Sequence, residues 1–328
     1  MSAPDAVRAH ELTGVLYVSL GSPSAPTPRA VRRFLDEFLG DPLVVDANRL
    51  LWWCVRKGII LPFRAPRSAA LYGRIWSAEG SPLLVHSRNF AAALARELGA
   101  SFRVALAMRY GEPSLGAGLA ELARAGCQRV LVLTAFPQAS RTTTGTIERE
   151  LRRNTLHLRS LAVLPAYFEH GAYVAALAER ARGAGAVDHW VFSFHGLPVR
   201  YVEQGDPYRE HCEGTARTLA HTLGLGPRDL TLAYQSRFGR ERWLEPDVRA
   251  VVGELAADRK RIGLVAPSFT TDCLETLEEL GLSLRAACRA RGGELVLVPS
   301  LNDAPIWVRG AAEIVRSAAP PERNQSMR

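Results

Sequence analysis

The sequence VFSFHGLP at residues 191–198 combines a buried strand with an abrupt stop. The apolar and small residues before His195 are typical of a strand inside a parallel sheet, and Gly196 and Pro198 end the pattern. In an open α/β sheet, ligands bind in the crevice beyond the carboxyl ends of the strands. The stretch therefore predicts that a rigid strand presents His195 to a substrate, although a lone histidine is more often a solvated loop residue.

Short apolar runs alternate with amphipathic segments along the chain, which is typical of parallel sheets covered by helices. The expected strands are 15–20, 102–107, 129–135, 158–164, 189–194, 230–234, 261–266 and 294–298. Helices are expected at 28–39, 115–125, 208–223 and 272–291. The alternation of strands and helices is similar in the two halves of the chain. It predicts an α/β fold of two Rossmann-like halves, with parallel sheets flanked by helices, that face a common cleft.

The expected division of the chain places the N-terminal half at 1–165 and the C-terminal half at 166–318. The last helix of the C-terminal half is expected to be free to pack against the N-terminal half. Residues 319–328 are polar and rich in proline, so they are expected to be a disordered tail. Neither half carries the GxGxxG or GxxxxGK[ST] pattern, which leaves dinucleotide and P-loop chemistry without a motif.

The composition is that of a soluble globular protein, with 47% hydrophobic and 23% charged residues in 328. No apolar run approaches the roughly 18 to 20 residues that span a bilayer, and the N-terminus lacks the apolar core of a signal peptide. A cytoplasmic location is therefore expected. Five scattered cysteines without a CxxC pair argue against a disulfide framework and against a thiolate zinc or iron–sulfur site.

The net charge of +8 is unevenly distributed. Residues 47–78 contain no acidic residue but six basic ones, interleaved with leucine, isoleucine, phenylalanine and tryptophan. A nucleic-acid surface would be basic but would seldom carry so many aliphatic side chains. The segment instead suits a contact with a membrane surface, or the lip of a pocket for an amphipathic anion. A buried helix with a solvated basic face is the plain alternative.

A second informative stretch, PSFTTDCLETLEEL, follows the strand expected at 261–266. Thr271 or Asp272 is expected to cap a helix, and Asp272, Glu275 and Glu279 share one stripe because they are spaced by three and four residues. Glu278 lies off this stripe and is expected to tolerate substitution. The leucines on the opposite, buried side are Leu274, Leu277 and Leu280.

If the sheet is doubly wound, Glu275 and His195 border the same crevice. Acidic residues in a first turn stabilise any helix, which accounts for Asp272 and in part for Glu275. One imidazole opposite one carboxylate, however, is also suited to take up a proton or to hold a divalent metal weakly. Only these two strong candidates converge, whereas a structural zinc site would use three or four ligands.

With both stretches in view, the chain resembles the ferrochelatases from about residue 14 to about residue 315. The matching segments are LGSP at 20–23, FLGDP at 38–42, RLLWW at 49–53, ILPFRAPR at 60–67, GSPL at 80–83, RYG at 109–111, FPQ at 136–138, SFHGLP at 193–198, GDPY at 205–208, YQSRFG at 234–239 with WL at 243–244, and DCLETLEE at 272–279.

The resemblance implies insertion of Fe²⁺ into protoporphyrin IX, the last step of haem formation. It implies that His195 and Glu275 form the catalytic and metal-binding pair, and that Asp272 and Glu279 belong to a path for protons or metal. Porphyrin-binding positions are implied at Leu20, Arg64, Tyr72, Arg109, Tyr110 and Trp243. The partners implied are protoporphyrin IX, Fe²⁺, an anionic membrane surface on the inner face, and the enzyme that oxidises the preceding porphyrinogen. Nucleic acid is not expected.

The chain departs from the family pattern at the pocket wall. Phe136 stands where tyrosine is usual, Ala139, Ser140 and Arg141 replace an aromatic-Ser-small run, and the segment after Pro246 is short. No cysteine follows Cys288, so neither an iron–sulfur cluster nor another permanent cofactor is expected. The alternatives are coproporphyrin as substrate, a cobalt or nickel chelatase of another tetrapyrrole pathway, and a porphyrin-binding protein without catalysis.

Overall fold

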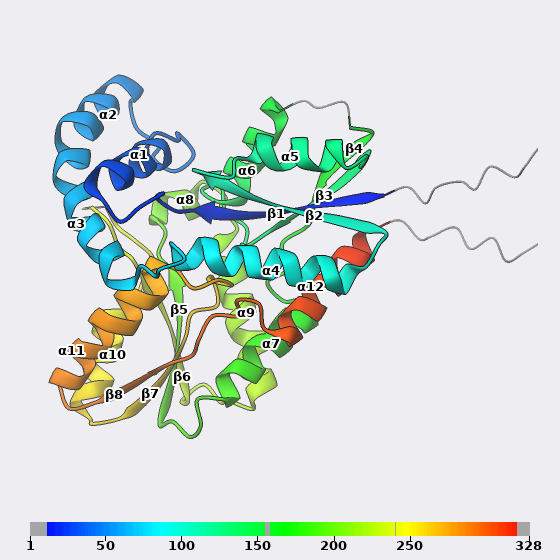
Figure 1. The fold of residues 1–328 in the computed structure, drawn as a ribbon. Helices are drawn as coiled ribbons and strands as arrows, with labels where there is room; N and C mark the ends of the chain where they lie inside the picture. Colours follow the sequence, from blue (N-terminus) through cyan, green and yellow to red (C-terminus); the bar gives the residue numbers. More distant parts are fainter. Residues whose placement is uncertain (1–11, 155–157, 240, 320–328) are drawn as a thin grey trace, which may run out of the picture.

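Two four-stranded parallel sheets form the centre of the computed structural model, which describes residues 12–154, 158–239 and 241–319 (Figure 1). The strand orders are β2-β1-β3-β4 and β6-β5-β7-β8. The first sheet contains β1 (Thr13–Gly21), β2 (Phe102–Tyr110), β3 (Arg129–Thr134) and β4 (Ser160–Val163). The second contains β5 (His189–His195), β6 (Leu230–Gln235), β7 (Arg261–Val265) and β8 (Glu294–Leu297). The α/β class, the two similar sheets and all eight expected strands are confirmed.

Helices connect successive strands, as parallel pairing requires. In the first half they are α1 (Pro28–Leu39), α2 (Arg49–Val55), the π-helix η1 (Arg56–Ile60), α3 (Leu61–Ile75), α4 (Pro82–Leu98), α5 (Leu115–Arg124) and α6 (Thr144–Arg153). In the second half they are α7 (Gly171–Arg182), α8 (Val199–Glu203), α9 (Tyr208–Leu223), α10 (Val248–Ala257), the π-helix η2 (Glu275–Leu284) and α11 (Arg285–Ala290), and α12 (Pro305–Ala318) follows the last strand.

The two sheets share one apolar core. Tyr17 of β1 and Phe192 of β5 belong to the same buried cluster, which also contains Trp307 of α12. The Trp307 ring stacks on Phe90 of α4, with 5.9 Å between ring centroids. Helix α12 packs against both α4 and α7 (Figure 1), so the last helix lies against both halves of the molecule. The boundary expected at residue 165 falls between β4 and α7, and residues 320–328 of the expected tail lie outside the described residues.

Helices α1, α2 and α3 form a lobe beyond the carboxyl end of β1 (Figure 1). The lobe has its own apolar cluster, in which Phe34 of α1, Leu61 of α3 and Tyr72 of α3 are buried. Five large apolar side chains of α2, η1 and α3 are nevertheless exposed. They are Leu50 (75% exposed), Leu51 (65%), Trp53 (53%), Ile59 (57%) and Phe63 (65%). No helix in the described ranges is long and apolar enough to cross a bilayer.

The helix expected at 272–291 starts later and is built differently. It is a π-helix from Glu275, with Leu274 at its N-cap and no side-chain cap, and it continues as α11 to Ala290. The predicted cap at Thr271 or Asp272 is therefore wrong. The Asp272 carboxylate instead accepts hydrogen bonds from the Thr276 hydroxyl at 2.9 Å and the Asn302 amide at 2.8 Å.

The predicted stripe along this helix is wrong in its first member. Asp272 lies before the helix, and the i→i+5 hydrogen bonds of a π-helix change which positions share a face. Glu278, expected to lie in a tolerant position, is buried, with only 4% of the residue exposed. Periodicity counted at 3.6 residues per turn does not reveal such a change.

Candidate active site

His195 lies at the carboxyl end of the central strand β5, paired in register with Gln235 of β6. Its backbone N–H donates to the Ser268 hydroxyl at 3.4 Å, and its Nδ1 lies 2.7 Å from the carbonyl oxygen of Gly196. Because a carbonyl only accepts, Nδ1 carries the proton of the neutral ring. Nε2 therefore holds the lone pair, which can take up a proton or bind a metal ion.

The turn after His195 has room for glycine alone. A Cβ atom at Gly196 would lie 2.8 Å from the Gln235 carbonyl oxygen and 3.0 Å from the ring of Trp243. The indole of Trp243 thus covers the backbone that holds the imidazole. Its Nε1 is buried without a hydrogen-bond partner among the described residues. An unpaired donor is costly to bury, so this N–H suits an acceptor on a ligand.

Gln235 connects the end of the sheet to the acidic π-helix. Its side-chain oxygen accepts from the Ser193 hydroxyl at 2.8 Å, and its amide nitrogen donates to the carbonyl of Glu275 at 3.3 Å. The structure thus brings His195 and the start of η2 to one edge of the sheet. Sequence reasoning did not select Gln235 as a site residue; the available signal was a polar residue at the end of an apolar strand.

The Glu275 side chain acts on groups from the first half of the molecule. Burial lowers the pKa of the Arg64 guanidinium, and the negative Glu275 carboxylate acts in the opposite direction. Burial raises the pKa of the Tyr72 hydroxyl, and Glu275 raises it further. Leu20 and Leu274 pack in the same apolar cluster as Tyr72. Leu20, Arg64, Tyr72 and Glu275 are therefore brought together where the two halves meet.

Arg109 and Tyr110 bind a buried carboxylate. The Arg109 guanidinium donates to Asp41 at 2.6 Å and to the Thr146 carbonyl at 3.1 Å, and the Tyr110 hydroxyl donates to Asp41 at 3.1 Å. Arg149 lies 2.7 Å from the same Asp41 oxygen. Only 9% of Arg109 is exposed. These contacts join β2 and α6 to the segment after α1, so Arg109 first of all holds the pocket wall together.

Glu279, on η2, is fixed by β6. The backbone N–H and the hydroxyl of Ser236 donate to its two carboxylate oxygens at 3.0 and 2.6 Å, and Arg249 lies 3.7 Å away. Ser236 adopts a left-handed conformation (φ 62°), which is unusual for a residue other than glycine. Asp272 and Glu279 thus have separate partners, and neither contact was predicted. Across the described ranges, no group of three or more His, Cys, Asp and Glu side chains could hold a metal ion.

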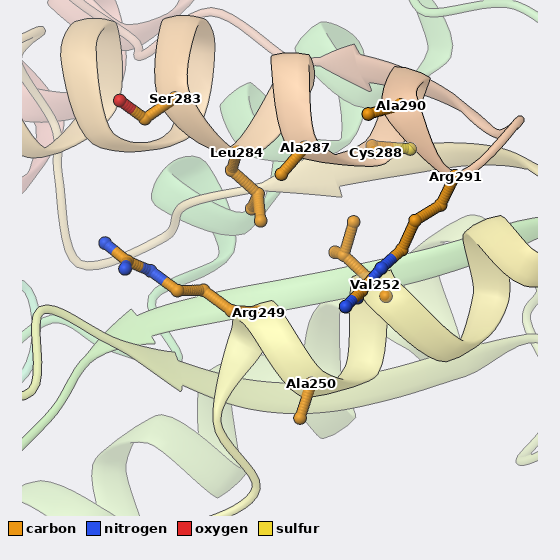
Figure 2. A pocket seen from close by; sticks show the side chains of 10 residues that line it. Arg249, Ala250, Val252, Ser283, Leu284, Ala287, Cys288, Ala290 and Arg291 are labelled. Carbon is orange, nitrogen blue, oxygen red and sulfur yellow. The ribbon is translucent and has the colours of Figure 1, made fainter.

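A separate pocket lies between α10 and α11 (Figure 2). Arg249 and Arg291 line it from α10 and from the end of α11, over a floor that includes Val252 and Leu284. None of the predicted site residues lines this pocket. Its polar lining consists of these two arginines with Ser283 and Cys288, and it includes no histidine or carboxylate. The candidate active site is therefore the edge of the sheet at His195, where the reactive groups converge.

The sequence comparisons connect this chain to one family. The family model described as Ferrochelatase matches residues 12–319. A ferrochelatase of Aliivibrio fischeri (strain MJ11) is 42% identical over 314 residues, which are 93% of this chain and 97% of that protein. A ferrochelatase of Stenotrophomonas maltophilia (strain R551-3) is 43% identical over 323 residues, 96% of this chain and 98% of that protein.

Solved structures of other chelatases share the fold. SirB from Bacillus subtilis with Fe³⁺ superimposes with a TM-score of 0.58 at 13% identity, covering 93% of this chain and 95% of that chain. CbiX, described as the terminal enzyme for siroheme biosynthesis in denitrifying bacteria, gives a TM-score of 0.52 at 18% identity, covering 94% and 100%. At such identities the likeness extends to the arrangement of sheets and helices alone.

Proposed function

Because the chain belongs to the ferrochelatase family, and so is an enzyme that inserts iron into a porphyrin for haem synthesis, we propose that its porphyrin is protoporphyrin IX and that His195 and Glu275 carry out the insertion. The observation that carries the assignment of the base is the hydrogen bond from His195 Nδ1 to the Gly196 carbonyl. This bond leaves Nε2 as the nitrogen with a lone pair, at the substrate edge of the sheet.

Insertion requires that two pyrrole N–H protons leave as the metal binds. In the proposed mechanism the Nε2 atom of His195 accepts a pyrrole proton as a general base. The Glu275 carboxylate supplies the negative charge that attracts Fe²⁺ and takes part in removing protons. Asp272 and Glu279 lie on either side of Glu275 in the sequence, and we assign them to the path for protons or metal. Iron is here a substrate that passes through the site.

The macrocycle would be recognised by apolar walls and a few donors. Leu20, Tyr72 and Leu274 come from one apolar cluster, which supports their place against the porphyrin face. Two hydrogen-bond donors suit the propionate carboxylates of the porphyrin. One is the Arg64 guanidinium, which lies 4.1 Å from the Phe238 ring centroid, and the other is the unpaired indole N–H of Trp243. Contacts remote from the reacting nitrogens supply the free energy that bends the macrocycle toward the metal.

We further propose that the lobe of α1, α2 and α3 rests on the anionic inner face of a membrane, from which a poorly soluble porphyrin would arrive. Five exposed large apolar side chains on α2, η1 and α3 support this. The acid-free run at 47–78 supplies basic groups among them. An amphipathic surface of this kind combines apolar burial with electrostatic attraction to anionic lipid.

We propose that no resident cofactor takes part. In the described parts of the chain the cysteines are unpaired, four of them are buried, and Cys54 alone is exposed. This scattered arrangement gives no thiolate cluster for iron and sulfur.

The function is tested by metal insertion under anaerobic conditions, with Fe²⁺ or Zn²⁺ and either protoporphyrin IX or coproporphyrin, followed by absorbance. Protoporphyrin is expected to be the better substrate by kcat/KM. A clear preference for coproporphyrin would overturn the choice of porphyrin and leave the chemistry intact. Binding of both porphyrins without insertion would favour a carrier and overturn the proposed activity.

A further inference from the structure

A second charged pair connects the two halves beside the candidate site. Arg74, at the end of α3, lies 2.5 Å from the Glu278 carboxylate of η2. The Ser283 hydroxyl donates to the same carboxylate oxygen at 2.7 Å. The side chain of Glu278 is only 5% exposed, while that of Arg74 is 50% exposed. A carboxylate buried to this extent is costly unless it is paired, so the contact fixes where Glu278 can lie.

The position of this pair in the chain links it to the reaction. Glu278 stands three residues after Glu275 on the π-helix that begins there. Arg74 stands two residues after Tyr72 and ten after Arg64, two side chains of α3 that interact electrostatically with the Glu275 carboxylate. The pair thus connects the helix that carries the candidate acid with the helix that carries candidate porphyrin contacts.

Helix η2 is otherwise held from its own half. Gln235 and Ser236, at the end of β6, bind the Glu275 carbonyl and the Glu279 carboxylate. Among the described residues, Arg74 and Glu278 form the one ion pair between α3 and η2. Without this ion pair, η2 would still be bound to the end of β6, but it would lose its ion pair with α3.

We propose that Arg74 is a positioning residue for metal insertion, acting through Glu278 to set the place of Glu275 relative to the porphyrin-facing side of α3. The inference rests on the proposed function. A buried ion pair adds little to stability by itself and serves more to select one arrangement. Misplacement of a reacting group by about 1 Å can cost about 100-fold in rate. Loss of one partner leaves a charge unpaired and also lowers stability, so turnover is compared with the melting temperature in each variant.

The test compares four variants with the wild type: Arg74→Ala, Arg74→Lys, Glu278→Gln, and the double change Arg74→Met with Glu278→Met. Measured for each are the melting temperature, the KM for protoporphyrin and kcat with Zn²⁺, normalised to porphyrin-binding sites. Arg74→Ala and Glu278→Gln are expected to lower kcat about 10- to 100-fold, with the KM for porphyrin within about threefold. Arg74→Lys should be intermediate, since an ammonium keeps the charge without the planar guanidinium.

The double variant separates positioning from stability. Replacing the buried Glu278 and its half-exposed partner Arg74 by apolar side chains of similar size is expected to return the melting temperature to about that of the wild type. Positioning predicts that kcat stays at least about tenfold low, and recovery of kcat together with the melting temperature would overturn the proposal. If either single variant fails to fold, the double variant still shows how loss of the ion pair changes kcat. Arg285→Ala, an exposed arginine just after η2, is the matched control. A wild type without activity on either porphyrin would instead contradict the proposed function.

Discussion

At the scale of single residues, the site depends on which nitrogen of His195 carries the proton. The Gly196 carbonyl decides this, and it can lie so close because no side chain fits at residue 196. Gly196, Trp243, which covers it, and His195 thus act together to fix the position of the imidazole. This arrangement leaves a single lone pair directed away from the backbone, which is what a base at the end of a strand requires.

Replacing His195 by alanine is expected to lower the rate of metal insertion by at least about 100-fold, because the proposed base is lost. Porphyrin affinity should stay within about tenfold, since the apolar walls remain. Insertion is followed by absorbance and binding by tryptophan fluorescence quenching. His221→Ala, an exposed histidine on α9, is the control. Near-normal turnover in the His195 variant would remove this residue from the mechanism.

Replacing Glu275 by glutamine keeps the size of the side chain but removes its charge. The hydrogen bond from Gln235 goes to the backbone carbonyl of Glu275 and is retained, so the melting temperature should change little. Turnover should fall about 10- to 100-fold. Glu254→Gln, exposed on α10, is the control, since Glu278 is buried and paired with Arg74. Retention of most activity would contradict the assigned role of Glu275.

Asp272 is expected to matter for folding through its partners rather than as a helix cap. Asp272→Ala leaves the buried Asn302 amide without its acceptor, which costs about 1–3 kcal/mol, and removes the nearer of the two acceptors of the Thr276 hydroxyl, the other being the Cys273 carbonyl at 3.3 Å. The free energy of unfolding, from urea titration, measures this. Asp272→Asn should cost less because it keeps one acceptor. Equal stability of Asp272→Ala and the wild type would show that these contacts contribute nothing.

At the scale of elements, helix α9 holds the turn after β3 through His211. The His211 Nδ1 accepts from the Ala139 backbone N–H at 3.1 Å, and its ring stacks on Phe168 with centroids 3.9 Å apart. Burial lowers the pKa of His211 below its ordinary value. The unfolded chain then binds the proton more readily than the folded one, so the contribution of His211 to stability is full above about pH 6.5 and is lost as the pH falls below it.

The free energy of unfolding should therefore decrease between about pH 7 and pH 5 more steeply in the wild type than in His211→Gln. Urea titration at several pH values measures the difference. His221→Gln, exposed on the same helix, should keep the wild-type slope. Identical slopes in all three proteins would show that His211 does not titrate between the two states.

Strands were predictable from the sequence and the acidic helix was not. Buried parallel strands such as β1 and β5 are near-continuous apolar runs, and the breaking residues Gly196 and Pro198 mark the edge where His195 lies. That His195 and the start of η2 reach one edge of the sheet follows from strand order, whereas the pairing of the His195 and Glu275 side chains stays a prediction. The burial of Glu278 was not foreseen, because it depends on Arg74, 204 residues away, and on a π-helix that no spacing rule reveals.

At the scale of the whole molecule, the lobe of α1, α2 and α3 places apolar and basic side chains together at one end. Its aromatic and aliphatic residues are exposed although the lobe has its own buried cluster. A lobe that only packed on the protein would not need them. If the lobe rests on a membrane as proposed, the same surface brings the candidate site close to that membrane.

Sedimentation with phosphatidylglycerol vesicles should be strong at low salt and weaken as salt is raised, since each nearby Arg or Lys contributes about 1 kcal/mol that screening reduces. The variant Leu50→Ser with Phe63→Ser should bind less at every salt concentration, because two exposed apolar contacts are lost. Equal binding to phosphatidylcholine and phosphatidylglycerol vesicles would contradict the electrostatic part of the proposal.

The position of α12 has a consequence for how the protein folds during its synthesis. A ribosome makes this helix after all eight strands, yet Trp307 covers Phe90 of the first half and Tyr173 of the second. The N-terminal half therefore leaves the exit tunnel with part of its apolar core, including Phe90, still exposed. It cannot complete its folding before the C-terminal half is made, as an independent domain would. Synthesis of this chain thus passes through a stage in which a chaperone has an apolar surface to bind, and this stage ends when α12 docks.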